Sequence, residues 1–311
     1  MSRLAIVQSS PVVLDRAATL QRAVTHVDEA VAGGAELVVF PEAYVAGYPA
    51  WIWRLKPGGD WDLSERLHIH LLEQAVDLQR GDLEPLCDAA RRNRVTVMCG
   101  MNERASDLGR STLFNCYVVI GPDGEILNRH RKLMPTNPER MVWGFGDGSS
   151  LNVVDTPCGR AGTLICWENY MPLARYALYA QGLEIYFAPT YDSGDDWIES
   201  MRHIAREAGC WVVGSGNLLR GSDMRIDVAG MADLFPDADE WVNPGDSVVI
   251  APGGELIAGP LRQEEGLLFA EIDVSRVGTA RRTLDIVGHY SRPDIFQLTV
   301  NKQPQSPVEF K

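Results

Sequence analysis

The chain has 311 residues and a formal net charge of −13 at pH 7, with 45% hydrophobic and 23% charged residues. These proportions are ordinary for a packed soluble protein, and an α/β architecture of this length can form a single domain. Because the chain is acidic and its acidic residues are spread along its length, a nucleic-acid-binding function is excluded from our expectations.

The N-terminal segment is apolar only over a short run and predicts a strand, Leu4–Gln8. It lacks the long apolar stretch of a signal peptide, so we expect a cytoplasmic protein. No run approaches the roughly 20 apolar residues of a membrane-spanning helix, so no membrane partner is expected. A helix is predicted next, because apolar residues recur at helical spacing from Leu20 to Val31 and Gly33 follows.

The following segments alternate between strand and helix patterns. Leu37–Phe40 is a continuous apolar run that predicts a buried strand, and it leads directly into Pro41-Glu42. A helix is predicted from Asp82 to Asn93, with Asp82 placed to cap it, and Val95–Cys99 predicts the next strand. This alternation is typical of a mixed α/β protein.

Two segments about 130 residues apart resemble each other, namely residues 118–127 and 248–257. Each predicts a strand, a Pro/Gly turn and a second strand, which together form a hairpin. Either two structurally similar halves or convergent hairpin chemistry would explain the match. We predict one domain over residues 1–300, an extended C-terminal tail over residues 301–311, and a loop-like interior segment at Arg220–Glu240.

Cysteine usage argues against a disulfide framework and against a metal centre. The spacing contains no C-x-x-C pair and no Cys/His cluster of zinc-binding type, so reduced thiols and no metal or other cofactor are expected. Free cysteine usually behaves as a small buried hydrophobe, which is the expected role of most of these residues. The six cysteines are Cys87, Cys99, Cys116, Cys158, Cys166 and Cys210.

Three polar residues follow apolar strands and are the candidates for chemistry. Glu42 follows Leu37–Phe40, Lys132 ends the strand pattern that begins at Ile126, and Cys166 ends Thr163-Leu164-Ile165. Sites in α/β proteins collect at the carboxyl ends of strands, so these side chains could converge.

Such a set would have a coherent chemistry. Cys166 would attack as a thiolate, aided by the N-terminus of a helix predicted at Pro172–Gly182. Glu42 would move protons and Lys132 would stabilise developing negative charge. Spacing leaves the alternatives open, because Cys166 could be a core residue, Glu42 a cap and Lys132 a surface charge.

The sequence around these residues resembles the nitrilase superfamily of carbon–nitrogen hydrolases. The three matching blocks are Phe40-Pro41-Glu42, residues 130–140 and Cys166-Trp167-Glu168-Asn169-Tyr170-Met171-Pro172, in the order Glu, Lys, Cys. Cys-Trp-Glu-Asn resembles the true nitrilases within that superfamily. Further matching segments are residues 143–147, 185–190, 243–247 and 288–294.

The resemblance implies a role for each matching residue. Glu42 is implied as the general base, Lys132 as the stabilising cation and Cys166 as the nucleophile. Glu139 is implied as a second carboxylate that positions Lys132 and the substrate. Glu168 is implied to line the site in a supporting role.

The resemblance also implies a four-layer α-β-β-α sandwich and a homo-oligomer built from dimers. Members of this branch often grow into spirals or filaments, for which Arg220–Glu240 and Gln303–Lys311 are the candidate contact segments. The short tail of this chain argues against long filaments. His130 and His289 have neither metal spacing nor an obvious partner and are predicted to be structural.

The implied reaction is hydrolysis of an organic nitrile to a carboxylic acid and ammonia, with an amide as a minor product. Aromatic residues near the matching blocks could wall an apolar pocket, which favours arylaliphatic or aromatic nitriles. The predicted substrate-binding residues are Tyr48, Trp51, Trp167, Glu168 and Tyr191. The alternatives are an amidase or carbamoylase of the same superfamily, a cyanide-hydrolysing enzyme, and a catalytically silent assembly protein with this fold.

Overall fold

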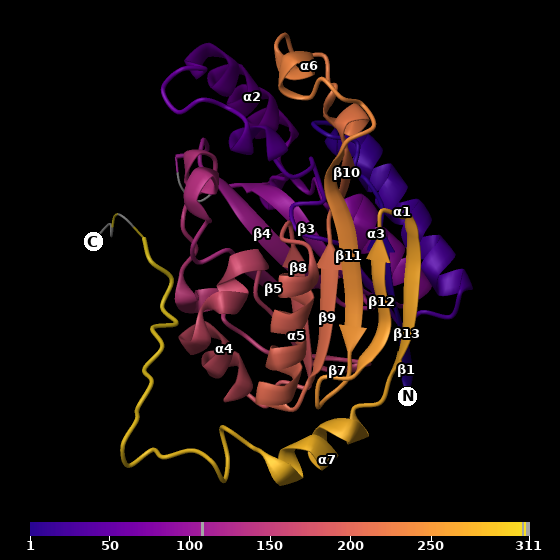
Figure 1. Ribbon diagram of the computed structural model, residues 1–311, viewed down its shortest axis with the longest axis vertical. Helices are drawn as coiled ribbons and strands as arrows, with labels where there is room; N and C mark the ends of the chain where they lie inside the picture. The colour runs from indigo at the N-terminus through magenta and orange to yellow at the C-terminus, as the bar shows by residue number, and fades with distance from the viewer. Residues whose placement is uncertain (107–108, 307, 309–311) are drawn as a thin grey trace.

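Two β-sheets lie face to face between two layers of helices, as the computed structural model shows for residues 1–106, 109–306 and 308 (Figure 1). The first sheet contains, in spatial order, β13 (Gly266–Ile272), β1 (Ser2–Gln8), β2 (Leu37–Val39), β3 (Thr96–Arg104), β4 (Leu113–Ile120) and β5 (Ile126–Arg131). The second contains β10 (Leu218–Arg220), β11 (Trp241–Ile250), β9 (Trp211–Gly216), β8 (Ile185–Thr190), β7 (Gly159–Thr163) and β6 (Val154–Thr156), with β12 (Leu256–Arg262) paired to β11.

The helices cover the outer face of each sheet and one end of the molecule. The longer ones are α1 (Arg16–Ala32), α2 (Trp61–Gln74), α3 (Glu84–Asn93), α4 (Pro172–Tyr179), α5 (Asp195–Ala208) and α7 (Ser275–Thr283), and α6 (Met231–Leu234) is a single turn. Helices α1 and α3 pack on the first sheet, while α4 and α5 pack on the second. The predicted four-layer α-β-β-α sandwich is therefore confirmed.

Alternation along the strands explains why the sheets are buried on both faces. In β1, Leu4 and Ile6 point into the layer between the sheets, whereas Ala5 and Val7 point toward α1 and α3. Successive strand residues face opposite sides, so a sheet covered on both faces needs a continuous apolar run. The run from Leu4 to Val7 supplies one, and the predicted first strand is confirmed.

The two sheets share one order of strands. Strands β1, β2 and β3 are parallel to one another and are followed by the antiparallel hairpin β4–β5. Strands β7, β8 and β9 are likewise parallel and are followed by the antiparallel hairpin β11–β12. Both predicted hairpins are confirmed, and the common order favours an internal duplication over chance convergence.

Two predicted boundaries differ from the structure. Helix α3 begins at Glu84, and Leu83 occupies the position before it. Asp82 was predicted to cap this helix, and that prediction is wrong because its carboxylate accepts a hydrogen bond from the backbone N–H of Asp77 and pairs with Arg80. Strand β3 extends past the predicted Val95–Cys99 to residue 104 because β4 pairs with it along that length.

A cap of aromatic and aliphatic residues covers one end of the sandwich. It brings together α2, α6 and the 3₁₀ helix η1 (Ala50–Trp53) around a cluster that includes Trp51, Trp143 and Phe235. The carboxyl ends of the strands that carry the candidate residues lie beneath this cap.

The chain after α7 is extended. Residues 284–306 contain no helix or strand, and the segment crosses back to the first sheet, where the Gln305 backbone N–H donates to Asp147. Residues 307 and 309–311 of the predicted tail lie outside the described residues. Within the described chain, the helices are all too short or too polar to cross a membrane.

Candidate active site

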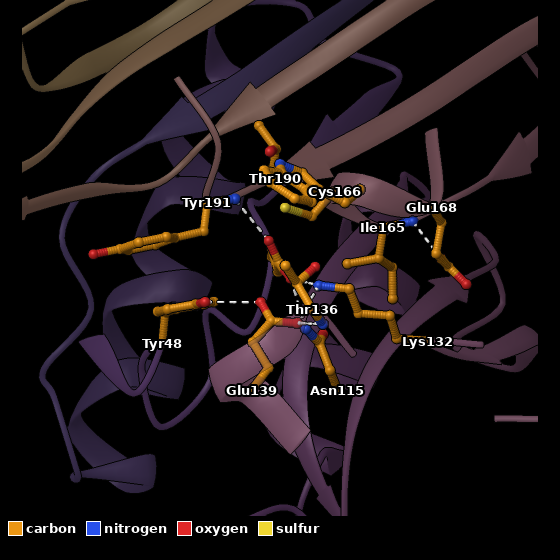
Figure 2. Close-up of polar contacts among 12 residues, drawn as sticks. Tyr48, Asn115, Lys132, Thr136, Glu139, Ile165, Cys166, Glu168, Thr190 and Tyr191 are labelled. Atoms are coloured by element: carbon orange, nitrogen blue, oxygen red, sulfur yellow. Dashed lines mark hydrogen bonds and ion pairs between the residues drawn. The ribbon is translucent and has the colours of Figure 1, made fainter. Parts of the chain in front are cut away.

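The structure brings Glu42, Lys132, Glu139 and Cys166 together in one place. Figure 2 shows Lys132, Glu139 and Cys166 in one cluster. Glu42 follows β2, Lys132 follows β5 directly, and Cys166 follows β7. All four residues are buried, with Glu42 and Lys132 fully excluded from solvent. Strand ends from both sheets therefore meet at one pocket, although the four residues are far apart in the chain.

The chain turns sharply at Glu42 because it must pass directly over β3. A Cβ atom at Gly100 would lie 2.2 Å from the carbonyl oxygen of Pro41 and 2.5 Å from the backbone nitrogen of Ala43. Ala43 itself has a left-handed φ of 48°. Only glycine at position 100 permits this close approach, which directs the Glu42 side chain into the site.

Three donors surround the Glu42 carboxylate. Lys132 Nζ and Asn115 Nδ2 donate to Oε1 at 2.8 and 2.6 Å, and the backbone N–H of Tyr191 donates to Oε2 at 2.6 Å. Burial raises the pKa of Glu42 above its ordinary value even though Lys132 and Asn115 oppose the shift. A carboxylate in this state is suited to accept a proton and return it.

Lys132 lies between two carboxylates. Its Nζ donates to Glu42 Oε1 and to Glu139 Oε2, each at 2.8 Å, and it lies 6.0 Å from the centre of the Trp143 ring. Burial by itself lowers the pKa of Lys132, but the charges of Glu42, Cys166 and Glu139 outweigh it and raise the pKa above its usual range. Lys132 is therefore a permanent cation in the site.

Glu139 combines a structural contact with a contact to the cation. It stands in the 3₁₀ helix η3 (Asn137–Met141), where its side chain accepts from the backbone N–H of Thr136 at 2.6 Å in a capping box. Its other oxygen accepts from the hydroxyl of Tyr48 at 2.7 Å. Glu139 is 1% exposed, so it is a buried acid of the site.

Cys166 occupies a strained turn that neighbouring side chains hold in place. Its φ is 52°, a left-handed conformation that side-chain-bearing residues adopt at a cost of about 1–3 kcal/mol. Asn169 Nδ2 donates to the carbonyl oxygens of Cys166 and Leu164, at 2.6 and 3.1 Å. Tyr186 in turn donates to Asn169 Oδ1 at 2.5 Å, so β8 holds the turn.

The sulfur of Cys166 faces the same charges. Burial raises the pKa of the Cys166 thiol well above its ordinary value, Glu42 adds to the shift, and Lys132 opposes it. The resting thiol is therefore neutral at pH 7, and its activation requires a proton acceptor such as Glu42.

The local structure after Cys166 differs from the predicted one. A 3₁₀ helix, η5 (Cys166–Tyr170), lies between the sulfur and α4, and α4 ends at Tyr179 rather than at Gly182. Because burial raises the thiol pKa, the net shift is opposite to a lowering, and the contribution of the dipole of this α-helix stays a prediction.

Glu168 braces the site from behind the pocket. Its carboxylate accepts from the backbone N–H groups of Ile165 and Leu133, each at 2.6 Å, and contacts His130 Nε2 at 3.0 Å. Ile165 precedes Cys166 and Leu133 follows Lys132, so one carboxylate fixes both chain segments. With both oxygens engaged, Glu168 supports the backbone rather than the pocket wall.

A pocket of about 260 Å³ opens at Cys166. The rings of Tyr48 and Tyr191 stack within it, with centroids 3.7 Å apart and planes 6° apart. Trp51 lies instead in the core of the cap, and Trp53, two residues on, contributes to the wall. The lining residues are Tyr48, Trp53, Thr136, Glu139, Cys166, Trp167, Tyr191, Asp192, Ser193, Val242 and Asn243.

Sequence reasoning missed several residues of the site. Asn115 is a buried polar residue in the otherwise apolar strand β4, and that break in the pattern is a signal that could have identified it. Thr136 begins a Thr-x-x-Glu capping box, which is also visible in the sequence. Asp192 stands in the loop after β8, whose course the sequence does not predict, and Asn243 lies near the start of β11.

The sequence of this chain is similar to those of known carbon–nitrogen hydrolases. A family model described as carbon-nitrogen hydrolase matches residues 3–282. The protein called Nitrilase 2 of Arabidopsis thaliana is 42% identical over 316 residues, which cover 99% of this chain and 91% of that protein. The Bifunctional nitrilase/nitrile hydratase NIT4B of Nicotiana tabacum is 40% identical over 313 residues, covering 99% of this chain and 88% of that protein.

A solved structure gives a consistent view of the fold. The crystal structure of a carbon-nitrogen hydrolase from Helicobacter pylori G27 matches with a TM-score of 0.71 and 21% identity, covering 95% of this chain and 96% of that one. At this level of identity the likeness supports the fold alone.

Proposed function

We propose that this chain, which belongs to the carbon–nitrogen hydrolase family and within it to the nitrilases, hydrolyses an organic nitrile to the carboxylic acid and ammonia. The observation that carries the proposal is the convergence of one thiol, one ammonium and two carboxylates at a single small pocket. A covalent route suits a nitrile, which is a poor electrophile toward water itself.

In the first step Cys166 sulfur bonds to the nitrile carbon. Glu42 takes the thiol proton, and a proton passes to the nitrile nitrogen, giving a thioimidate. Lys132 lies where it can stabilise the negative charge that develops on that nitrogen. Glu139 and Tyr48 hold Lys132 in position through the contacts described above.

In the following steps, oxygen atoms from water replace the nitrogen atom on the thioimidate carbon. A water molecule activated by Glu42 adds to the thioimidate carbon and forms a tetrahedral species. Breaking the carbon–nitrogen bond releases ammonia and leaves a thioester, which a second water hydrolyses to the acid and free Cys166. Two water molecules are consumed for each nitrile.

The tetrahedral species has a second outcome. If its carbon–sulfur bond breaks before the carbon–nitrogen bond, an amide is released. The name of the Nicotiana relative, which includes nitrile hydratase, supports a minor amide product here. Product analysis that finds only acid with every substrate would contradict this part of the proposal.

The pocket favours nitriles with an aromatic group. Tyr48, Tyr191, Trp53 and Trp167 present aromatic rings around Cys166, and the volume is small for a ligand site. Arylaliphatic nitriles such as arylacetonitriles combine a flat ring with a short link to the reacting carbon, which fits such walls. Simple aliphatic nitriles and cyanide are the alternatives within the nitrilase reaction.

The test is an ammonia-release screen over aromatic, arylaliphatic and aliphatic nitriles, each paired with its amide. A nitrilase leaves the amide largely untouched, whereas an amidase or carbamoylase prefers it. Cys166→Ala serves as the control, and ammonia release by the unmodified protein that the folded variant lacks excludes a catalytically silent assembly protein. Full activity in the presence of a chelator is expected.

We also propose a cytoplasmic homo-oligomer built from dimers, following the family resemblance. Segments Arg220–Glu240 and Gln303–Lys311 are the candidate contact segments, and the first contains α6 and forms part of the cap. Light scattering at several concentrations tests the assembly, and a monomer at all concentrations would contradict it.

A further inference from the structure

The pocket at Cys166 adjoins a second hollow. That hollow measures about 460 Å³, and its remaining walls include Met134, Arg140 and Met171. Trp167 and Thr136 line both spaces, so the indole of Trp167 stands between them. The side chain of Trp167, the residue after Cys166, therefore forms a partition between the two hollows.

Core packing does not hold this partition in place. Trp167 is 51% exposed, unlike most tryptophans of this chain. An exposed aromatic side chain is free to exchange between rotamers unless a specific contact selects one. The position of Trp167 consequently depends on its polar and ring contacts.

Asp192 makes the directional contact to Trp167. The indole Nε1–H donates to Asp192 Oδ2 at 2.9 Å, and the Tyr170 hydroxyl approaches the same oxygen at 3.5 Å. Tyr170 also meets the indole edge to face, with centroids 6.1 Å apart and planes at 83°. The carboxylate thereby selects one orientation of the ring.

Asp192 is itself held in place by the neighbouring residues at the end of β8 and in the loop that follows. Its backbone N–H donates to Thr190 Oγ1 at 2.7 Å, and its Oδ1 accepts from the backbone N–H of Ser193 at 2.9 Å. The residue before it, Tyr191, donates its backbone N–H to Glu42. The segment that orients the base therefore also carries the acceptor for the partition.

We propose that Asp192 is a positioning residue that limits substrate length by holding Trp167 between the two hollows. This proposal rests on the proposed function, because it concerns the nitriles that reach Cys166. With the partition in place, the substituent on the nitrile carbon is confined to the inner pocket. Without it, a longer substituent extends into the outer hollow between Met134 and Met171, whose flexible side chains accept varied shapes.

A direct role for Asp192 in binding a cationic substrate gives a different expectation. Direct recognition needs the negative charge, whereas holding Trp167 needs only an oxygen acceptor. Asp192→Asn removes the charge and keeps one carbonyl oxygen, which can accept from the Trp167 indole only when the NH₂ group faces the backbone N–H of Ser193. Asp192→Ala removes both, so the two variants separate the two roles.

The first experiment measures access to Cys166 without requiring nitrile turnover. Iodoacetamide and N-(4-phenylbutyl)iodoacetamide each form a thioether with the Cys166 sulfur and release iodide. The rate at each variant is followed by mass spectrometry of the peptide that contains Cys166. Asp196→Ala, at an exposed acid on α5, is the matched control, and Trp167→Ala shows the effect of removing the partition.

The expected result is a change in the ratio of long-reagent to short-reagent rates. We expect this ratio to rise about tenfold in Asp192→Ala and Trp167→Ala, the scale on which pocket fit discriminates small groups. It should stay within about twofold of the unmodified protein in Asp192→Asn and Asp196→Ala. An unchanged ratio in Asp192→Ala would overturn the proposal.

Nitrile kinetics supply the second readout. Asp192→Ala should lower the ratio of the KM for a nitrile with an extended phenylalkyl chain to the KM for a short arylacetonitrile. The corresponding ratio of kcat values should change less. If no nitrile is turned over but the alkylation ratio still rises, the proposed nitrilase function is contradicted and the positioning role of Asp192 is supported. If nitriles are hydrolysed with the wild-type length preference in every variant, the partition alone fails.

Discussion

Two buried carboxylates at the site, Glu42 and Glu168, illustrate how differently the same group can be used. Glu42 faces an ammonium and a thiol, and one of its two oxygens receives two side-chain donors. Glu168 faces His130 and two backbone N–H groups, which cannot move without moving the chain. The identity of the donors, rather than burial, separates an acid suited to proton transfer from one suited to holding the backbone.

Both carboxylates act on the same sulfur by different routes. Glu42 acts on Cys166 by charge, because its carboxylate raises the pKa of the thiol across the pocket. Glu168 fixes the backbone before Cys166 and after Lys132. Substitutions should therefore separate loss of chemistry from loss of geometry.

Removing the sulfur that both carboxylates serve should have the largest effect. Cys166→Ala is expected to lower ammonia release by about 10⁴-fold or more, because a covalent route has no substitute for its nucleophile. The measurement is ammonia release under saturating nitrile, with circular dichroism to check the fold. Substantial turnover by a folded Cys166→Ala protein would contradict the role of this residue.

Removing the charge of Glu42 should come next. Glu42→Gln keeps the shape and is expected to lower kcat about 10³-fold, within the range for loss of general acid–base catalysis. If activity survives within tenfold, Glu42 is not the base.

Replacing Glu168 should affect stability as well as rate. Glu168→Gln presents an NH₂ group to one of the two backbone donors, leaving a buried N–H unpaired at a cost of about 1–3 kcal/mol. The expected activity loss is about 10-fold to 100-fold, smaller than that of Glu42→Gln because the reacting groups remain. Urea unfolding followed by fluorescence measures the stability change, and a rate loss without destabilisation would contradict the bracing role.

The pH profile should distinguish the two acids again. Glu42 acts as a base only when deprotonated, and burial raises its pKa, so kcat/KM should fall with decreasing pH along a limb that lies above pH 4.5. Loss of the Asn115 hydrogen bond, which lowers this pKa, should move the limb to higher pH in Asn115→Ala. Glu168→Gln should leave the limb in place, and a limb that moves with Glu168 instead would reverse the assignment.

The raised pKa of Glu42 also makes the stability of the folded protein depend on pH. A raised carboxyl pKa means that the folded protein binds this proton more readily than the unfolded chain. The stabilising contribution of protonated Glu42 is therefore present below pH 4.5 and is lost as the pH rises through the folded-state pKa.

The smallest effect is expected at the edge of the cluster. Tyr48→Phe removes the hydroxyl that donates to Glu139 and keeps the ring that stacks on Tyr191. Loss of one such bond is worth about 1 kcal/mol, or about fivefold in rate, if it acts through the position of Lys132. Steady-state kinetics check this, and a loss as large as that of Glu42→Gln would assign Tyr48 a direct part in the chemistry.

The sequence predicted the fold well where its pattern is periodic or continuous. The run Leu4 to Val7 and the two Pro/Gly hairpins led to the correct strands, and strand ends led to Glu42, Lys132 and Cys166. Glu139 came only from the family resemblance. Its burial depends on a capping turn that folds it back toward Lys132, and such a contact has no periodic signature.

Other features of the site depend on where loops point. Trp51 and Trp53 are two residues apart in one 3₁₀ helix, yet one packs in the cap and the other reaches the pocket. Sequence alone could not choose between them, because a short helical turn does not state which side faces the ligand. The raised pKa of Cys166 likewise depends on its burial in the folded protein.

The brace at Glu168 has a practical consequence for protein engineering. Because a single side chain outside the cavity ties the nucleophile segment to the cation segment, the spacing between these two segments does not rely on the pocket wall alone. Val242 and Ser193 can therefore be randomised in combinatorial libraries while this spacing is inherited, whereas Trp53 is better kept because it donates to the Tyr48 hydroxyl.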